Sequence, residues 1–467
     1  MARHKTRVLT CNRWSPKGEA MAGDGKKTAV WRGIVGEEAR VQITRRGANR
    51  DYGEVDTPLT PSSWRVEPPC ERMDSCGGCA HMHLNAAGQH EAKRWLIADA
   101  FRAEGLDGVP VEAMVGSPLQ DYRHVIKLIA SVGDRGRPRL GAPARFTRRI
   151  VPIPKCNVVT PGLRDFTGHA AHKMFELELR PFTEETGGLF RYIHARESRH
   201  SGEILVTVVA TRENGLIRKY CEELAHGPVS GVHLHVHNRR DNTIFDRDDD
   251  GCVHTKRIWG RQTLTESLLG VKLSVGPTDF FQTNPAMAEK LYAYVAELSG
   301  ASEGVPILDL YCGVGGFALA LAPRTGWALG IESNATSVER AIGNARLAGV
   351  HAEFIRGAVC EALIEQKPVL KDLRPVVIVD PARRGLEQGV GSAILDLRPR
   401  RVIYVSCNAR GLARDLRNFL ARGFELKALR PFDMFPNTPH IEVVALLEPT
   451  DAGEEPVRRP PRRKMVS

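Results

Sequence analysis

The chain has 467 residues, of which 42% are hydrophobic and 26% are charged, a composition typical of a globular protein. This length exceeds what one hydrophobic core usually supports, so two or three domains are expected. No run of about 18 apolar residues occurs and residues 1–5 precede no signal-peptide core, which predicts a cytoplasmic protein without a membrane span. The formal net charge of +11 favours a polyanionic partner, although solubilising surface charge gives the same balance.

Residues 1–66 are predicted to form a small β-barrel. Short alternating runs at 28–31 and 39–43 are separated by glycine-rich turns, as in compact β-modules. Basic side chains are interspersed among these runs: Lys26, Lys27, Arg45, Arg46 and Arg50. Such a barrel can bind nucleic acid, and a solvated basic face explains the same residues equally well.

The ten cysteines are interpreted by their spacing, because a disulfide framework is not expected in a reducing compartment. Cys70, Cys76 and Cys79 cluster, and the next cysteine along the chain is Cys156. Two glycines between Cys76 and Cys79 let the backbone fold tightly enough for both thiolates to reach one metal or cluster. Four such sulfurs suit an iron–sulfur cluster or a tetrahedral zinc; merely adjacent thiols are the alternative, and an even one for Cys156 by itself.

Residues 67–268 are expected to form a β-rich central domain that carries this cysteine cluster. A helix is predicted at 89–104, where Ala92, Leu96 and Ala100 recur at helical spacing. Strand signals recur further along, at 125–132, 204–210 and 229–236.

From about residue 270 strands and helices alternate, which predicts an α/β domain with a doubly wound sheet. The runs at 376–379 and 402–405 are short and β-branched, as strands buried on both faces of a parallel sheet should be. Asp380 follows the first run and Cys407 follows the second. Because ligands bind at the carboxyl ends of such strands, the acid and the thiol are expected in one crevice.

A glycine-rich turn at 311–316 joins a strand at 307–310 to a helix, and such a turn allows close approach of a nucleoside-bearing ligand. Glu332 ends the next strand, where a carboxylate can accept both hydroxyls of a ribose in an adenosine-containing cofactor. A doubly wound domain that binds some other nucleotide would show the same pattern.

Four motifs extend this pattern: Asp-Leu-Tyr-Cys-Gly at 309–313, Asp-Pro-Ala-Arg-Arg-Gly at 380–385, Ser-Cys-Asn at 406–408, and Phe-Pro followed by His-Ile-Glu within 435–442. Together they resemble the S-adenosylmethionine-dependent RNA uracil-5-methyltransferases over nearly the whole chain. The resemblance implies a TRAM-like barrel at 1–66, a central domain at 67–268 and a class I Rossmann-like methyltransferase sheet at 269–449. It also implies a monomer that acts on RNA. The prolines and basic residues at 450–467 predict a disordered basic tail.

The resemblance assigns roles to individual residues. Cys407 resembles the family nucleophile and Glu442 its general base. The residues implied to bind S-adenosylmethionine are Gln282, Tyr311, Glu332 and Asp380. Those similar to the family's [4Fe–4S] ligands are Cys70, Cys76, Cys79 and Cys156.

Three positions depart from the family pattern. Ala382 and Ala409 replace prolines, which predicts two looser loops, and Gly316 replaces an asparagine that helps to hold the cofactor in many members.

The chemistry of uracil explains why a thiol and a base are needed. Carbon 5 is too poor a nucleophile to take a methyl group until a thiolate adds to carbon 6. A loop uridine is the expected target, since flipping a loop base is least costly. The cysteine cluster and the TRAM-like start resemble the ribosomal-RNA branch of the family, which implies 23S ribosomal RNA as the substrate. Transfer RNA is the alternative substrate. A non-catalytic RNA-binding or chaperone protein on this fold is the alternative class, and the intact Cys407 and Glu442 argue against it.

Overall fold

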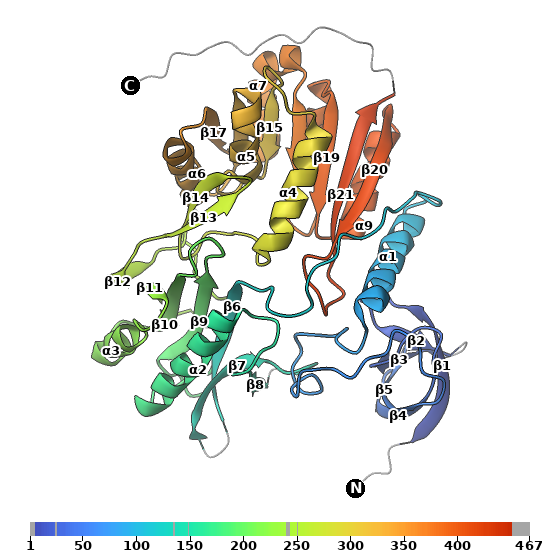
Figure 1. The fold of residues 1–467 in the computed structure, drawn as a ribbon, viewed down its shortest axis with the longest axis vertical. Coiled ribbons are helices and arrows are strands. Elements are labelled where there is room, and N and C mark those ends of the chain that lie inside the picture. The colour runs from blue at the N-terminus through green and yellow to red at the C-terminus, as the bar shows by residue number, and fades with distance from the viewer. Residues whose placement is uncertain are drawn as a thin grey trace.

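The computed structural model describes residues 5–23, 26–133, 136–147, 149–239, 243–249 and 251–450. These residues form an N-terminal barrel, a central sheet and a C-terminal sheet flanked by helices (Figure 1). The predicted basic tail lies outside the described residues except for Thr450. None of the described helices is long and apolar enough to cross a membrane.

The N-terminal strands close into a barrel, which confirms the predicted β-module. In spatial order the strands are β1 (Thr6–Trp14), β2 (Ala20–Ala22), β3 (Thr28–Trp31), β5 (Asp51–Pro58) and β4 (Glu38–Arg46). Along β4, Ala39, Val41 and Ile43 are buried and alternate with more exposed residues, so one face of the strand fills the barrel. Closure leaves the small sheet without a free edge.

The central sheet has seven strands and is backed by two helices. In spatial order the strands are β12 (Lys256–Gly260), β11 (Val229–Val236), β10 (Ile204–Ala210), β9 (Phe190–Glu197), β6 (Val125–Val132), β7 (Pro138–Pro143) and β8 (Ile150–Pro152). Helices α2 (Pro161–Glu176) and α3 (Gly215–Glu223) contribute Leu163, Phe166 and Tyr220 to the core beneath it. The three strands predicted from the sequence in this region are confirmed.

The C-terminal sheet also has seven strands, and its order brings the motif-bearing strands together. In spatial order they are β17 (Ala352–Arg356), β16 (Ala328–Glu332), β15 (Ile307–Leu310), β18 (Val376–Val379), β19 (Arg401–Ser406), β21 (Glu442–Pro449) and β20 (Phe424–Phe432). The first five run parallel, and β21 pairs antiparallel with both β19 and β20. The carboxyl ends of β15, β16, β18 and β19 therefore lie at one edge.

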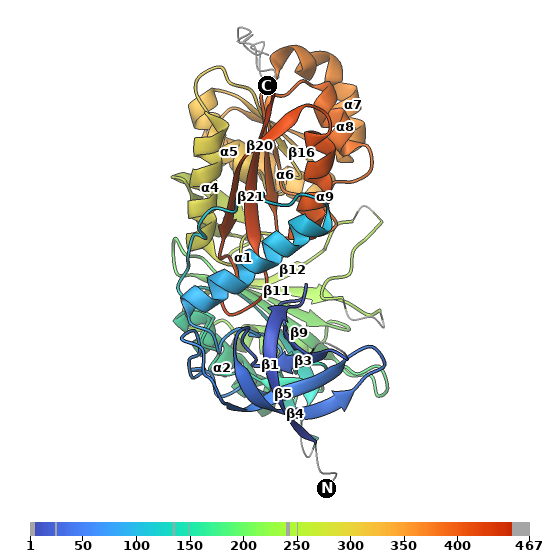
Figure 2. The same ribbon diagram turned by 90° about the vertical axis from the view of Figure 1, so that its right-hand side faces the viewer.

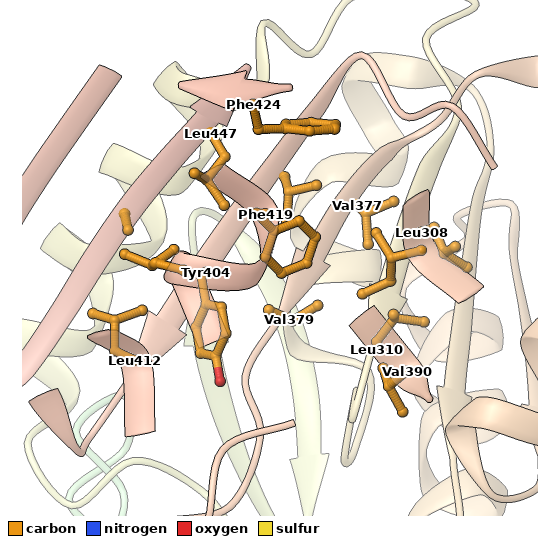
Figure 3. Packing of buried hydrophobic residues seen from close by; sticks show 14 of the residues in the cluster. Leu308, Leu310, Val377, Val379, Val390, Tyr404, Leu412, Phe419, Phe424 and Leu447 are labelled. Carbon is orange, nitrogen blue, oxygen red and sulfur yellow. The ribbon is translucent and has the colours of Figure 1, made fainter. Parts of the chain in front are cut away.

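Helices cover both faces of this sheet, as the alternating pattern predicted. They are α4 (Pro285–Ser299), α5 (Gly316–Thr325), α6 (Ala335–Ala348), α7 (Val359–Leu370), the 3-10 turn Lys371–Leu373, α8 (Val390–Asp396) and α9 (Ala409–Leu420). Leu308 and Val377 point into the core shown in Figure 3, together with Phe419 of α9. Ile307 and Ile378 belong to the core on the opposite face, because successive strand residues alternate sides.

Helix α1 (Ala86–Ala103) connects the barrel to the C-terminal sheet (Figure 2). It starts earlier than predicted because the side chain of Asn85 accepts a hydrogen bond from the Gly88 amide at 2.9 Å and caps the helix. Ala92 packs in the barrel core, whereas Ile97 and Phe101 pack in the core of the C-terminal sheet. One helix thus contributes side chains to both the barrel core and the core of the C-terminal sheet, which are far apart in sequence.

The hairpin of β13 (Leu264–Leu268) and β14 (Val271–Val275) packs against the C-terminal sheet's helices. Leu268 and Leu273 form a cluster with Val314 and with Ala345 of α6. The predicted domain boundary between 268 and 269 falls inside this hairpin, so the hairpin groups structurally with the residues that follow it.

Candidate active site

Asp380, Cys407 and Glu442 meet at the carboxyl edge of the C-terminal sheet. Asp380 directly follows β18 and Cys407 directly follows β19, and these strands pair in parallel. Glu442 begins β21, whose antiparallel register pairs Val443 with Ser406. One further step along that register sets Cys407 beside Glu442. The acid and the thiol predicted from the sequence to meet therefore lie at one edge of the sheet, together with the second acid.

The two carboxyl groups of this site are buried together. Glu442 is 4% exposed, and burial, followed by the charge of Asp380, raises its pKa well above the usual value. Burial raises the pKa of Asp380 to about 7. The positive charge of Arg383 acts in the opposite direction on Glu442. Because two neighbouring carboxylates do not ionise independently, the pair retains a proton near neutral pH.

The Cys407 thiol is partly exposed and stays protonated in the ligand-free protein at neutral pH. Burial, then the charges of Glu442 and Asp380, raise its pKa to about 11, and Arg383 opposes this shift. A thiolate, which is the nucleophilic form, therefore has to be generated when the site is filled.

The loop after Asp380 is fixed to the start of α9 although Ala382 and Ala409 replace the family's prolines. The Asn408 side chain donates to the Arg383 carbonyl at 2.7 Å. Arg414 Nη2 donates to the Arg384 carbonyl at 2.8 Å, and Asp415 Oδ2 accepts from the Leu386 amide at 2.8 Å. Side-chain hydrogen bonds thus restrain this loop.

The glycine turn brings Glu332 against the end of β15. Gly313 N donates to Glu332 Oε2 at 3.2 Å, and Asn334 N donates to Oε1 at 2.8 Å. Tyr311 has a φ of +63°, a strained value for a residue with a side chain and one often found at functional sites. Turn and acid are therefore adjacent, as predicted.

Asp309 is a buried acid beneath this turn. Its Oδ2 accepts from the Ala318 amide at 2.9 Å, which ties β15 to the start of α5, while Oδ1 has no hydrogen-bond partner in the described part of the chain. Burial is the main reason why its pKa rises to about 8. Asp309 therefore acts as a structural support of the turn.

Tyr292 is a site residue that the sequence reasoning missed. Its ring stacks on Phe317 with centroids 4.0 Å apart, and a Cβ atom on Gly316 would collide with its hydroxyl oxygen. Burial raises the pKa of Tyr292, followed by the charges of Asp380 and Asp309, so the hydroxyl lies close to the site's carboxyls. The sequence feature that could have indicated Tyr292 is the glycine at 316, because a residue without a side chain leaves room there for a ring from α4.

Gln282 lies on the segment 276–284, which the central sheet and α6 hold in place. Arg196 Nη2 of β9 donates to the Asp279 carbonyl at 2.8 Å, and Arg340 Nε of α6 donates to Asp279 Oδ2 at 2.8 Å. Asn284 caps α4 by accepting from the Met287 amide at 3.2 Å. Gln282 is partly exposed, and within the described residues no hydrogen bond joins its side chain to Tyr311, Glu332 or Asp380.

The four predicted metal-binding cysteines lie in one neighbourhood. Burial, and then the charges of Cys156, Cys76 and Cys70, raise the pKa of Cys79 to about 12, so these sulfurs are within electrostatic reach of one another. All four are partly exposed. Across the described part of the chain, however, no group of three or more His, Cys, Asp or Glu side chains has an arrangement that could hold a metal ion. The sulfurs are gathered but do not form a closed coordination site.

Known proteins resemble this chain along most of its length. A family model described as tRNA (uracil-5-)-methyltransferase matches residues 201–450. A protein of Caldanaerobacter subterraneus described as an uncharacterized RNA methyltransferase is 31% identical, covering 91% of this chain and 94% of its own. A protein of Gloeobacter violaceus with the same description is 32% identical, covering 92% and 93%.

One solved structure matches nearly the whole fold. It is the Pyrococcus abyssi tRNA (uracil-54, C5)-methyltransferase in complex with S-adenosyl-L-homocysteine, with a TM-score of 0.72 and 26% sequence identity. The match covers 94% of this chain and 99% of that chain, so the barrel, the central sheet and the C-terminal sheet all have to be included in it.

Proposed function

We propose, from the premise that this chain belongs to the tRNA (uracil-5-)-methyltransferase family, that it methylates carbon 5 of a uridine in RNA through a covalent adduct with Cys407. The chain is an S-adenosylmethionine-dependent RNA methyltransferase. We propose that its reaction passes through the covalent adduct. The observation that carries it is the meeting of Cys407, Glu442 and Asp380 at one edge of the sheet.

The Cys407 thiol first loses its proton to water as uracil fills the site. The Cys407 thiolate adds to carbon 6 of uracil, and the electrons of the 5,6 double bond move toward carbon 5 and O4. Carbon 5 then bonds to the methyl carbon, and the carbon–sulfur bond of the sulfonium breaks. Glu442 removes the proton from carbon 5, the double bond re-forms, and the thiolate is expelled.

The base role of Glu442 requires its ionisation. Burial, followed by the charge of Asp380, raises the pKa of Glu442 well above its usual value, so Glu442 holds a proton in the ligand-free site and has to lose it before it can act as the base. The charge of Arg383 favours both the Cys407 thiolate and the Glu442 carboxylate. We therefore assign Arg383 to stabilising the two ionised groups while uracil occupies the site.

We assign S-adenosylmethionine, whose sulfonium supplies the methyl group when bound, to the crevice formed by Gln282, Tyr311, Glu332 and Asp380. The Glu332 carboxylate stands at the glycine turn with its backbone contacts already made, as a ribose acceptor should. The S-adenosyl-L-homocysteine in the Pyrococcus abyssi structure supports the same cofactor class.

We further assign the C-terminal sheet to the Rossmann-like class I methyltransferases and the barrel to the TRAM class. The parallel strand order with one antiparallel strand inserted next to β19 supports the first assignment. We propose that the methyltransferase domain begins before the β13–β14 hairpin rather than at residue 269, because the hairpin packs on α6.

The substrate RNA has two candidates. Ribosomal 23S RNA follows from the resemblance of the barrel and cysteine region, whereas transfer RNA is favoured by the Pyrococcus abyssi structure, which matches those regions as well. Mapping of 5-methyluridine by mass spectrometry in both RNA classes, from cells with and without this protein, distinguishes them. Methyluridine that disappears from neither class in the deletion strain would contradict the proposed function.

We propose that Cys70, Cys76, Cys79 and Cys156 bind a [4Fe–4S] cluster after their thiols reorient. Their shared neighbourhood and their thiolate chemistry suit such a cluster. Protein purified without oxygen should contain about four irons per chain, and Cys76→Ala should lose them. Cys252→Ala, which changes a cysteine outside this group, is the control. Stoichiometric zinc in place of iron would contradict the assignment.

A further inference from the structure

A pocket of about 270 Å³ lies between the barrel and the residues around 81 and 145, away from Cys407 and Glu442. Aromatic rings from several segments line it: Trp14, Trp31, Tyr52 and Phe146. Pockets for drug-sized molecules span about 300–1,000 Å³, so this one suits a ligand with a single flat ring system.

The walls pair aromatic rings with guanidinium groups. The Arg145 guanidinium lies 3.9 Å from the ring centroid of Trp31 and 5.4 Å from that of Phe146, and the Arg45 guanidinium lies 4.0 Å from that of Tyr52. Phe146 is 70% exposed, an unusual state for a large apolar ring. Flat rings and guanidinium planes of this kind stack on unpaired nucleic-acid bases.

Two hydrogen-bond donors in the pocket wall have no partner among the residues that the structure describes. They are Trp31 Nε1 and Arg145 Nη1, and both atoms are buried. Buried donors without acceptors are unfavourable, so they mark a place where a ligand can supply the acceptor. The ring nitrogens and carbonyl oxygens of a nucleobase are acceptors of this kind. The two donors become accessible to them once the Arg145 guanidinium shifts.

The charge around the pocket suits a phosphate backbone. Among the described residues its lining includes four cationic side chains, Lys17, Arg32, Arg45 and Arg145, and one carboxylate, Glu19. A neighbouring hollow shares Arg45 and Tyr52 and adds further cations: Arg13, Lys27, Arg46 and Arg50. A strand with one base in the pocket can therefore continue along a basic surface.

The pocket is joined to the segment that leads to Glu442. His81, which lines the pocket, donates from its amide to the Asn437 carbonyl at 2.9 Å, and its Nε2 lies 2.7 Å from the Gly18 carbonyl. Gly18 packs so closely on Pro439 that a Cβ at residue 18 would collide with it. Only His440 and Ile441 separate Pro439 from Glu442 along the chain.

We infer that this pocket binds one unpaired RNA base near the flipped uridine and thereby selects which uridine is methylated. The inference rests on the proposed function, because it takes RNA as the substrate. Stacking supplies the affinity, and the two unpartnered donors supply the base preference.

Direct binding tests the pocket without methylation. The probe is a random-sequence 12-nucleotide RNA with a 3′ fluorescein, and its anisotropy is measured with the full chain. Phe146→Ala and Arg145→Met should each weaken binding at least about fivefold, and Phe146→Ala should leave the salt dependence unchanged because it removes no phosphate contact. Phe175→Ala is the matched control, since Phe175 is also exposed and lies 5.7 Å from the Arg137 guanidinium. Equal affinities for all these variants and the wild type would overturn the inference.

Methylation kinetics separate the pocket from the catalytic proposal. With RNA from cells that lack this protein, Phe146→Ala should raise KM for RNA at least about fivefold while kcat stays within about twofold. If the wild type methylates no RNA but Phe146→Ala still weakens 12-mer binding, the proposed function fails and the pocket is supported. If the wild type methylates RNA and Phe146→Ala has an unchanged KM, the pocket inference is overturned and the function stands.

Discussion

Cys407 combines a position suited to attack with a thiol that is hard to ionise, since its pKa is raised to about 11. Without RNA, its alkylation by iodoacetamide should therefore be slow at pH 7, where on the order of 10⁻⁴ of the thiol is ionised, and should rise about tenfold per pH unit. Asp380→Asn should accelerate alkylation severalfold at pH 9, and Arg383→Met should slow it.

Mass spectrometry of the peptide that contains Cys407 follows this reaction without interference from other cysteines. Rapid alkylation at pH 7, with no rise toward pH 9, would show that the buried carboxyls do not control the thiol.

Gly316 and Tyr292 share one space beside the glycine turn. Gly316→Ala should destabilise the protein by about 1–3 kcal/mol, because the new methyl group collides with the Tyr292 hydroxyl. Tyr292→Phe combined with Gly316→Ala should recover part of that loss, because the ring carbons lie 3.2 Å away and can adjust. Denaturant unfolding of the two single variants and the double variant measures this coupling. Stability losses that add up in the double variant would contradict the idea that the two side chains occupy one space.

At the level of the elements, α1 is held to the segment before Glu442 by a fully buried ion pair. Lys93 Nζ donates to Asp433 Oδ1 at 2.5 Å and to the Phe435 carbonyl at 2.9 Å, and His90 Nε2 lies 3.5 Å from Asp433 Oδ2. Burial tends to raise the pKa of Asp433, but His90 and Lys93 outweigh it and lower the pKa. Asp433 therefore stabilises the fold above about pH 4, the range of a free carboxyl, and this contribution is lost as the pH falls through the lower folded-state pKa.

Lys93→Met should destabilise the protein by about 3–5 kcal/mol, because it leaves the Asp433 charge buried without its partner. Arg94→Met is the matched control: Arg94 is the next residue, is exposed, and pairs with Glu91 at 3.4 Å, so its loss should change stability by less than about 1 kcal/mol. The denaturant midpoint at pH 7 measures both. An equal, small effect of the two substitutions would contradict the role given to the pair.

The sequence predicted those elements whose signals are local. The β-branched runs before Asp380 and Cys407 are typical of strands buried on both faces of a parallel sheet. The same runs therefore predicted both the strands and the placement of Asp380 and Cys407 at the carboxyl ends of those strands. The Lys93–Asp433 pair joins residues 340 positions apart, and the sequence around neither residue predicts the contact. The position of the Tyr292 hydroxyl could not be predicted for the same reason, because it depends on Gly316 in another element.

In the whole molecule, several distant parts converge on the segment 433–440, which leads to Glu442. Asn437 exchanges hydrogen bonds with Gln89 of α1 at 2.7 and 3.1 Å. Tyr122 Oη donates to the Pro436 carbonyl at 3.0 Å, and the Asn284 side chain donates to the Met434 carbonyl at 3.3 Å. The position of Glu442 is therefore set by helix α1, the central region and α4 together, and no single sequence pattern could have predicted it.

Covalent catalysis by Cys407 is tested most directly with RNA that contains 5-fluorouridine. The fluorine on carbon 5 cannot leave as a cation, so elimination is blocked and the adduct accumulates when S-adenosylmethionine is present. Mass spectrometry should find the methylated fluorouridine attached to Cys407, and Cys407→Ala should form no adduct. With ordinary RNA, Glu442→Gln should trap a similar adduct because the base is missing. An adduct at Cys312 or Cys360, or methyl transfer by Cys407→Ala, would contradict the mechanism.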